Sequence, residues 1–260
     1  MTEQETLWLS SFALGLNTSQ ILARDSFSPE EEAKIDAVLS RREKGEPLQY
    51  IMGIADFVGR DFCVGPGVLI PRQDTGTLIE GVRRCIGSEE KFTFLDWGTG
   101  SGCIAITILL EYPEAFAYMA ENSEQAAKFA RLNLERYNLT HRSRIIFNAE
   151  SLTGCKILVS NPPYIPSGEI DGLMREVRDY EPRSALDGGI DGLKFYREII
   201  SLAERIDCEF LVLEIGGTGQ REFLRGASAK FEVSGEILDG GNFPRCIVLR
   251  RRNYHEEAQG

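Results

Sequence analysis

The sequence predicts an α/β protein, in which a mostly parallel sheet with helices follows a small helical domain. Three observations lead to this prediction. From residue 91 onward, strand patterns alternate with helix patterns, as in proteins built from parallel strands joined by helices. The last two strand patterns have no helix between them, so we expect an antiparallel hairpin at one end of the sheet. Roughly the first forty residues read as helices instead.

Residues 1–48 are predicted to be the small helical domain. An apolar run near the start allows helical spacing, and a further helix is expected to begin at Ser28. Ser28 can cap this helix and Pro29 fits its first position, while the acids that follow suit the positive end of the helix dipole. We expect the helix to run to Arg42.

Residues 49–70 are predicted to link this domain to the rest of the chain through a β-hairpin. Apolar residues at 57–58 and 62–64 flank the segment 59–61, which indicates a short turn. The sheet domain would then occupy residues 71–260.

Strand and helix patterns alternate in order through this second domain. Strands are expected at 91–97, 115–121, 144–150, 156–161, 209–215, 231–238 and 245–251, and helices at 103–112, 123–137, 192–205 and 220–230. The polar tail from residue 253 is expected to fray.

Composition excludes several classes of protein. The net charge of −11 lowers the expectation of an enzyme held to nucleic acid by phosphate contacts, so no stable nucleic-acid binding is expected, and it suits a basic protein partner better. No apolar run reaches the roughly 20 residues of a membrane-spanning helix. The acidic start lacks the basic region of a signal peptide, so we expect a cytoplasmic protein that does not bind a membrane.

The six cysteines and two histidines give no metal-site pattern. No two cysteines form a CxxC pair and most lie inside apolar segments, which favours reduced thiols in the core. His141 and His255 stand apart from other ligand-type residues. We therefore expect no metal and no histidine-based catalytic triad.

A glycine-rich turn follows the first strand of the sheet domain. That strand ends at Asp96, and a helix is expected to begin directly after the turn. Glycines in such a turn let the backbone approach a ligand closely. The spacing differs from the G-x-G-x-x-G of dinucleotide sites and is similar to the nucleotide-binding loop of class I methyltransferases, although the turn by itself could also be an ordinary tight turn. The loop consists of Gly98, Thr99, Gly100, Ser101 and Gly102.

Acids follow the next two strands. Glu121 is placed to accept hydrogen bonds from both ribose hydroxyls of an adenosine, or else it caps the following helix. With the glycine loop upstream, the ribose role is favoured. Glu150 could accept from an adenine amino group, and a surface acid is nearly as good an interpretation.

The segment Asn161-Pro162-Pro163-Tyr164 follows the fourth strand. The two prolines fix the backbone and leave the Pro162 carbonyl free to face a ligand. The Asn161 side chain adds another carbonyl acceptor, and Tyr164 adds a flat apolar face. Two acceptors set at a planar NH2 group can bind its two hydrogens and direct its lone pair at an electrophile. The alternative is a rigid turn in which Tyr164 only packs in the core. This alternative is less favoured because the segment follows a predicted cofactor loop.

These motifs, with four further segments, resemble the release-factor glutamine methyltransferases, the PrmC/HemK family. The further segments are RREKGEPLQYIMG at 41–53, VLIPR at 68–72, YEPRSALDGGIDGLKFYREII at 180–200 and LEIGGTGQ at 213–220. NPPY alone is shared with DNA adenine-N6 methyltransferases, whereas the combination is specific, and the resemblance covers nearly the whole chain.

The resemblance implies a class I methyltransferase fold, Rossmann-like, with an N-terminal helical domain joined by a β-hairpin. It implies S-adenosylmethionine as cofactor and S-adenosylhomocysteine as product. The substrate would be the glutamine of the GGQ loop in class I peptide chain release factors. The glycine loop, Glu121 and Asn161 would hold the cofactor, with Glu150 at the adenine. Residues 161–164 would hold the glutamine amide, and the helical domain would recognise the protein substrate.

Some positions depart from the family pattern. Gly76 follows Thr75 where an acid is usual, and Glu121 and Glu150 stand where aspartate is common. Lys156 stands where an acid often precedes the fourth strand. None of these departures lies in NPPY.

Three other functions remain open at this point. They are glutamine methylation of a ribosomal protein, adenine-N6 methylation of DNA, and a non-enzymatic adaptor that retains the fold. The DNA enzyme would need a recognition region and a basic groove that the sequence does not display. The adaptor would be expected to lose the glycine loop or NPPY, and both are intact.

Overall fold

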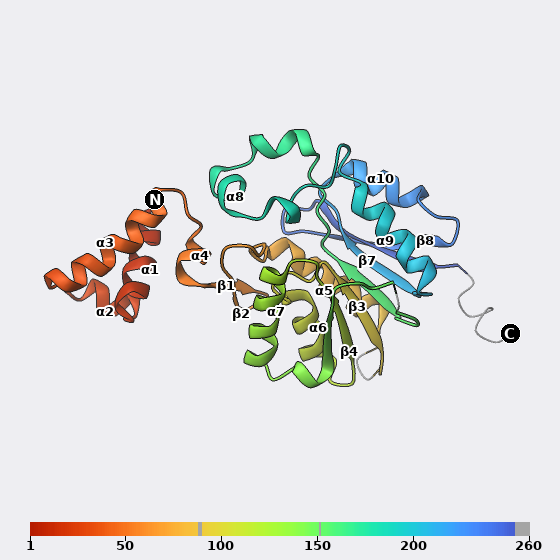
Figure 1. Ribbon diagram of the computed structural model, residues 1–260, viewed down its shortest axis with the longest axis horizontal. Helices are drawn as coiled ribbons and strands as arrows, with labels where there is room; N and C mark the ends of the chain where they lie inside the picture. The colour runs from red at the N-terminus through yellow and green to blue at the C-terminus, as the bar shows by residue number, and fades with distance from the viewer. Residues whose placement is uncertain (88–89, 151, 253–260) are drawn as a thin grey trace.

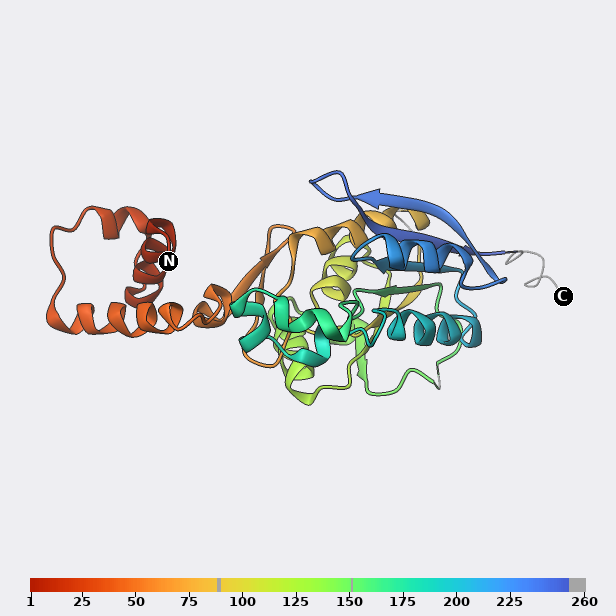
Figure 2. The same ribbon diagram turned by 90° about the horizontal axis from the view of Figure 1, so that it is seen from above.

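The computed structural model describes residues 1–87, 90–150 and 152–252. A small helical unit stands at one end of the molecule and is joined by a short connection to a larger α/β domain (Figures 1 and 2). The expectation that the tail from residue 253 frays lies outside the described residues. Within the described residues, no helix is both long enough and apolar enough to cross a membrane.

Local capping determines where the N-terminal helices begin. The Ser28 side chain accepts from the Glu31 backbone while the Glu31 side chain accepts from the Ser28 backbone, and Pro29 opens the helix, so the predicted start is confirmed. This helix ends at Glu43, one residue beyond the predicted Arg42. The unit comprises α1 (Glu3–Leu14), α2 (Thr18–Leu22), α3 (Pro29–Glu43) and the short α4 (Leu48–Met52).

The connecting hairpin has a tighter turn than the sequence predicts. Strands β1 (Ile54–Phe57) and β2 (Arg60–Cys63) pair antiparallel around Val58 and Gly59, which both have positive φ. The predicted turn at 59–61 is therefore wrong by two residues, because Arg60 and Asp61 already belong to β2. Such two-residue turns match the right-handed twist of paired strands.

In the part of the chain that the structure describes, the main sheet has seven strands in the order β5-β4-β3-β6-β7-β9-β8. The first five of these strands are parallel, and β9 lies antiparallel between β7 and β8, which confirms the mostly parallel sheet with a C-terminal antiparallel hairpin. The strands are β3 (Thr93–Trp97), β4 (Phe116–Ala120), β5 (Ser143–Ile146), β6 (Ile157–Ser160), β7 (Phe210–Glu214), β8 (Phe231–Leu238) and β9 (Pro244–Arg251).

Helices cover both faces of the sheet. One core cluster joins it to α5 (Thr77–Cys85), α6 (Cys103–Glu111) and α7 (Glu124–Arg136). The other joins it to α9 (Lys194–Arg205) and α10 (Thr218–Gly226) (Figure 1). All six cysteines are free thiols, four of them buried. The sequence did not predict α5, nor the short helix α8 (Arg175–Tyr180) between β6 and α9.

Short 3-10 turns complete the element order. They are η1 (Gln73–Gly76), η2 (Thr140–Arg142), η3 (Ser167–Gly172) and η4 (Arg183–Ala185).

Strand order places the functional edge of the sheet. From β3 the chain proceeds outward to β4 and β5, then returns to β6 on the other side of β3 and proceeds to β7. Neighbouring connections therefore diverge at the carboxyl ends of β3 and β6. Open α/β sheets bind ligands in the crevice that forms at such a point.

Arg42 connects the helical unit to the α/β domain. Its guanidinium pairs with Glu5 of α1 and with Glu176 of α8, each at 2.7 Å. The Tyr180 hydroxyl donates to the backbone oxygen of Lys44 at 3.0 Å. Helix α8 thus holds the end of α3 against the larger domain.

Gly81 allows α5 to lie close to the sheet, and this generates a stability prediction. A Cβ atom at Gly81 would lie 2.6 Å from Cγ1 of Val212 and 3.0 Å from the Cys246 sulfur. We expect Gly81→Ala to lower the free energy of unfolding by about 1–3 kcal/mol, because overpacking outweighs the better helix propensity of alanine. Gly219 of α10 has no atom within 4 Å of its would-be Cβ, so Gly219→Ala is the matched control and should stabilise slightly. Urea denaturation of both variants checks the difference in sign.

Candidate active site

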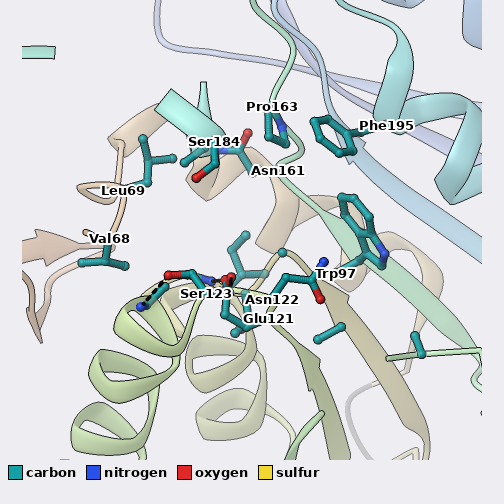
Figure 3. Close-up of a pocket in the computed structure, with 18 of the residues that line it drawn as sticks. Val68, Leu69, Trp97, Glu121, Asn122, Ser123, Asn161, Pro163, Ser184 and Phe195 are labelled. Atoms are coloured by element: carbon teal, nitrogen blue, oxygen red, sulfur yellow. Dashed lines mark hydrogen bonds between the residues drawn. The ribbon is translucent and has the colours of Figure 1, made fainter. Parts of the chain in front are cut away.

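A cavity of about 1040 Å³ opens at the carboxyl ends of β3, β4, β5 and β6. Figure 3 shows Glu121, Asn122 and Ser123 on one side of it and Asn161, Pro163 and Ser184 on the opposite side. Val68 and Leu69 form a third wall, and the rings of Trp97 and Phe195 form a fourth. The cavity is of the size that takes a nucleoside-sized ligand.

The glycine loop forms the floor of this cavity. The backbone N–H groups of Gly98 and Thr99 both donate to the carbonyl of Ala120, which ties the loop to the end of β4. Gly100 has a φ of 56°, a left-handed conformation that favours glycine. Residues 98–101 line the cavity.

Gly102 has a different position in the structure. It does not line the cavity and instead precedes α6 with a φ of 82°. A Cβ atom there would lie 2.9 Å from the terminal methyl of Met119. Its small size therefore serves the packing of α6 on β4.

Glu121 is held by the backbone around it. One carboxylate oxygen accepts from the Gly100 N–H at 2.9 Å and the other accepts from the Ser123 N–H at 2.8 Å. A carboxylate has about four lone-pair positions, so acceptor capacity on both oxygens remains for a ligand. Glu121 thus contacts the start of α7 and also lines the cavity, so the ribose role stays a prediction.

Asp96 anchors the loop from below. It is fully buried, and its Oδ2 accepts from the Thr99 hydroxyl at 2.5 Å and from the Ala105 N–H at 3.3 Å. Oδ1 has no hydrogen-bond partner within the described chain. Burial raises the pKa of Asp96 to about 7, against the two hydrogen bonds that lower it.

Asn161 and Pro163 reach the cavity from the end of β6, facing Glu121 across it (Figure 3). The side-chain nitrogen of Asn161 donates to the hydroxyl of Thr75 at 3.1 Å, and the side-chain oxygen has no hydrogen-bond partner among the described residues. Pro162 and Tyr164 do not line the cavity.

The Tyr164 ring lies behind the cavity wall. A Cβ atom at Gly216 would lie 2.5 Å from this ring, and the Tyr164 hydroxyl donates to a Glu214 carboxyl oxygen at 3.4 Å. Burial, with the nearby Glu214 charge, raises the pKa of Tyr164 to about 12.

Glu150 lies at the rim, on the segment that follows β5. The residue is exposed, and its backbone N–H donates to the Asn148 side chain at 2.6 Å. Phe147 and Ala149 line the same wall. The structure therefore brings Glu150 to the cavity together with the glycine loop, Glu121 and Asn161.

Several lining residues were not predicted from the sequence. The rings of Trp97 and Phe195 have centroids 5.6 Å apart, although nearly one hundred positions separate them in the chain. Trp97 directly follows Asp96, and this was the signal that could have placed it at the cavity.

The segment 68–72 is held over the cavity by Glu181, whose side chain is 1% exposed. One Glu181 oxygen accepts from the Ile70 N–H at 3.1 Å, and the other pairs with Arg72, which lines the cavity. The VLIPR segment at 68–72 and the YEP segment at 180–182 therefore contact each other through Glu181.

Comparisons with known proteins agree with this architecture. Residues 2–53 match the PrmC N-terminal domain and residues 71–176 match the methyltransferase small domain. The release factor glutamine methyltransferase of Geobacter sulfurreducens is 41% identical, over 85% of this chain and 79% of that protein. The enzyme of the same name from Moorella thermoacetica is 36% identical, over 94% and 89%.

Among solved structures, the fold is similar to the catalytic domain of hMettl16 in complex with a MAT2A 3′UTR hairpin. The TM-score is 0.55 with 18% identity, over 86% of this chain and 81% of that one. At this identity the likeness concerns the fold alone.

The buried Asp96 generates a prediction about pH and stability. The Asp96 carboxyl has a pKa of about 7 in the folded chain and an ordinary pKa of 3.8, so the folded state binds its proton more tightly than the unfolded state does. Its contribution to stability is therefore complete below pH 3.8 and is lost as pH rises to about 7. Relative to the parent protein, we expect Asp96→Asn to gain up to about 1.4 kcal/mol of unfolding free energy per pH unit between about pH 4 and 7.

Urea denaturation across this pH range measures that gain. The same substitution at the exposed Asp25 is the control. A stability difference between Asp96→Asn and the parent that does not change with pH would contradict the prediction.

Proposed function

The chain belongs to the release factor glutamine methyltransferase family, and on this basis we propose its substrate and the roles of its residues. The proposed reaction transfers a methyl group from S-adenosylmethionine to the side-chain amide nitrogen of the glutamine in the GGQ motif of class I peptide chain release factors. The observation that carries the proposal is the free Asn161 oxygen at the end of β6, facing Glu121 across one cavity.

The glycine loop and Glu121 suit the cofactor. A Cβ atom at Gly98 would meet nothing within 4 Å, so the loop leaves open space above its backbone. Glu121 keeps acceptor capacity for the two ribose hydroxyls. Glu150 at the rim would accept from the adenine amino group, on the wall that Phe147 and Ala149 share. When bound, the cofactor supplies an electrophilic methyl group on its sulfonium.

Asn161 and Pro162 would orient the glutamine amide. The Asn161 oxygen would accept one amide hydrogen, which raises electron density on a nitrogen whose lone pair is otherwise delocalised. The Pro162 carbonyl is the proposed second acceptor, although Pro162 itself does not line the cavity in this structure. Pro163 closes the wall beside them. Positioning does most of the catalysis, because the electrophile is already activated, so no general base near neutral pKa is needed. Tyr164 would support this segment from behind through its contact with Glu214.

The helical domain would recognise the protein substrate. Its helix α1 exposes Trp8 and Phe12, 44% and 43% accessible and one helical turn apart. Arg42 and the α8 contacts hold this unit beside the α/β domain, so that one partner can touch both.

The function is tested by incubating the full-length protein with a purified release factor and methyl-labelled S-adenosylmethionine. Mass spectrometry of the peptide that contains GGQ should show one added methyl group on the glutamine. Parallel incubations contain ribosomal proteins or DNA in place of the release factor. Label on either of these, with none on the release factor, would overturn the proposed substrate.

Asn161 gives the sharpest prediction for catalysis. Asn161→Ala removes one acceptor while the prolines keep the turn, so single-turnover transfer should fall by a factor on the order of 10². Cofactor affinity, measured by calorimetry, should change much less. Asn161→Asp keeps an acceptor but adds a charge, so it should bind cofactor well and transfer slowly. Near-normal transfer by both variants would mean that the segment is only a rigid turn.

A second prediction concerns the exposed face of α1. The double variant Trp8→Ser, Phe12→Ser should raise KM for the whole release factor by roughly tenfold or more. Burial of each ring in a complex would contribute about 1.5–3 kcal/mol to the binding free energy. The turnover number should stay unchanged. Phe243→Ser, at an exposed phenylalanine of the β8–β9 turn, is the matched control. An unchanged KM for the double variant would remove α1 from substrate recognition.

A further inference from the structure

The Asn161 side chain has a defined polar partner in the wall of the cavity. Its nitrogen donates to the hydroxyl of Thr75 in η1, and this threonine is 2% exposed. Because the nitrogen is engaged there, the oxygen is the atom left for the cavity. The orientation of this amide therefore depends on the Thr75 hydroxyl.

A hydroxyl alone cannot fix that orientation, because it can either accept or donate. If it donated to Asn161, the amide would turn over and present its NH2 group to the cavity. Two NH2 groups would then face each other, and the substrate amide would have lost an acceptor. A second acceptor must therefore bind the Thr75 hydroxyl proton.

Glu214, at the end of β7, is the group in reach of that proton. Its side chain is buried, and the nearby Thr75 hydroxyl lowers its pKa, although no hydrogen bond between the two side chains is formed within the described chain. The Tyr164 hydroxyl donates to Oε1, while Oε2 has no partner that meets hydrogen-bond geometry within the described chain. A carboxylate only accepts, so it can take the Thr75 proton and leave the Thr75 oxygen to accept from Asn161.

We propose that Thr75 and Glu214 are positioning residues that hold the Asn161 amide with its oxygen toward the substrate. In the proposed order Asn161 donates to Thr75, and Thr75 donates to the unpaired Oε2 of Glu214. This inference rests on the proposed function of Asn161 as the acceptor of the substrate amide. It assigns a reason for the buried acid of β7, which touches no part of the cavity.

The direction of donation should depend on pH. Burial raises the pKa of Glu214 to about 7, while Thr75, Arg245 and Tyr164 lower it and Asp74 raises it. The other titratable groups nearby are Cys103 of α6, Tyr196 of α9 and Cys246 of β9. Protonated Glu214 can donate to Thr75, which removes the bias on Asn161. The transfer rate should therefore fall as pH drops from about 8 to 6.

Isosteric substitutions test the arrangement in the full-length protein. Thr75→Val should slow single-turnover transfer by about tenfold or more at saturating cofactor, with cofactor affinity nearly unchanged. Thr75→Ser keeps the hydroxyl and should restore most of the rate. Thr107→Val is the matched control, since the buried Thr107 hydroxyl has no partner within the described residues. Glu214→Gln should remove the change of rate between about pH 6 and 8.

A second measurement needs no substrate. The side-chain amide signal of Asn161 in a nitrogen–proton correlation spectrum can be assigned by its loss in Asn161→Ala. In the parent protein this signal should shift with a midpoint near pH 7, and the shift should vanish in Thr75→Val and Glu214→Gln. If the parent shows this shift but methylates no release factor, the proposed substrate fails while the positioning role stands.

Two results would overturn the positioning role. The first is a folded Thr75→Val variant that transfers methyl groups at the rate of the Thr107→Val control. The second is an Asn161 amide signal that ignores pH in the parent protein, or keeps the same titration in Glu214→Gln. Thermal denaturation of each variant identifies any that fails to fold; if Thr75→Val does so, Glu214→Gln and the pH dependence of the Asn161 signal in the parent protein carry the test.

Discussion

The pairing of β3 with β6 is the constraint on which the rest of the site depends. The glycine loop leaves one strand and Asn161 leaves its neighbour, so their separation is set by the spacing of hydrogen-bonded strands, about 4.8 Å. The Ser160 hydroxyl donates to the Trp97 carbonyl at 2.7 Å and extends this pairing past the last ladder residue. Two chemically different walls are thereby held in register by backbone geometry.

Buried acids support both walls. Asp96 lies under the glycine loop and Glu214 lies behind Asn161, and each ends a strand or nearly so, with one oxygen lacking a partner within the described chain. Burying an incompletely paired carboxylate is unfavourable, which raises the pKa of both groups to about 7. Both acids accept hydrogen bonds from hydroxyl or amide donors at the site. The folded protein therefore tolerates the unfavourable burial of these acids where they fix the orientation of groups of the site.

The sequence predicted the elements whose signals are local, and the reasons for the misses are physical. Strand and helix alternation, the Ser28 cap and the NPPY turn depend on neighbouring residues. The cap lies where predicted and each strand of the main sheet overlaps its predicted range, although the strand predicted at 144–150 ends at Ile146. Helix α5 was missed because Gly81 interrupts its helical pattern. A glycine is needed there because α5 packs closely against Val212, which lies far along the chain. The contacts of Glu181 with Ile70 and of Trp97 with Phe195 are likewise long-range, so no local pattern announces them.

Arg42 has a consequence for how a large partner would be captured. The helical unit joins the sheet domain through the β1–β2 hairpin, and the ion pair of Arg42 with Glu176 restricts its rotation relative to that domain, while the pair with Glu5 fixes Arg42 within the unit. A partner that touches the helical unit is then presented to the cavity at a high effective concentration, since little orientational freedom remains to be lost. Weak contacts at two separate surfaces can add up to avid binding, and loss of either surface would weaken the complex more than its own area suggests.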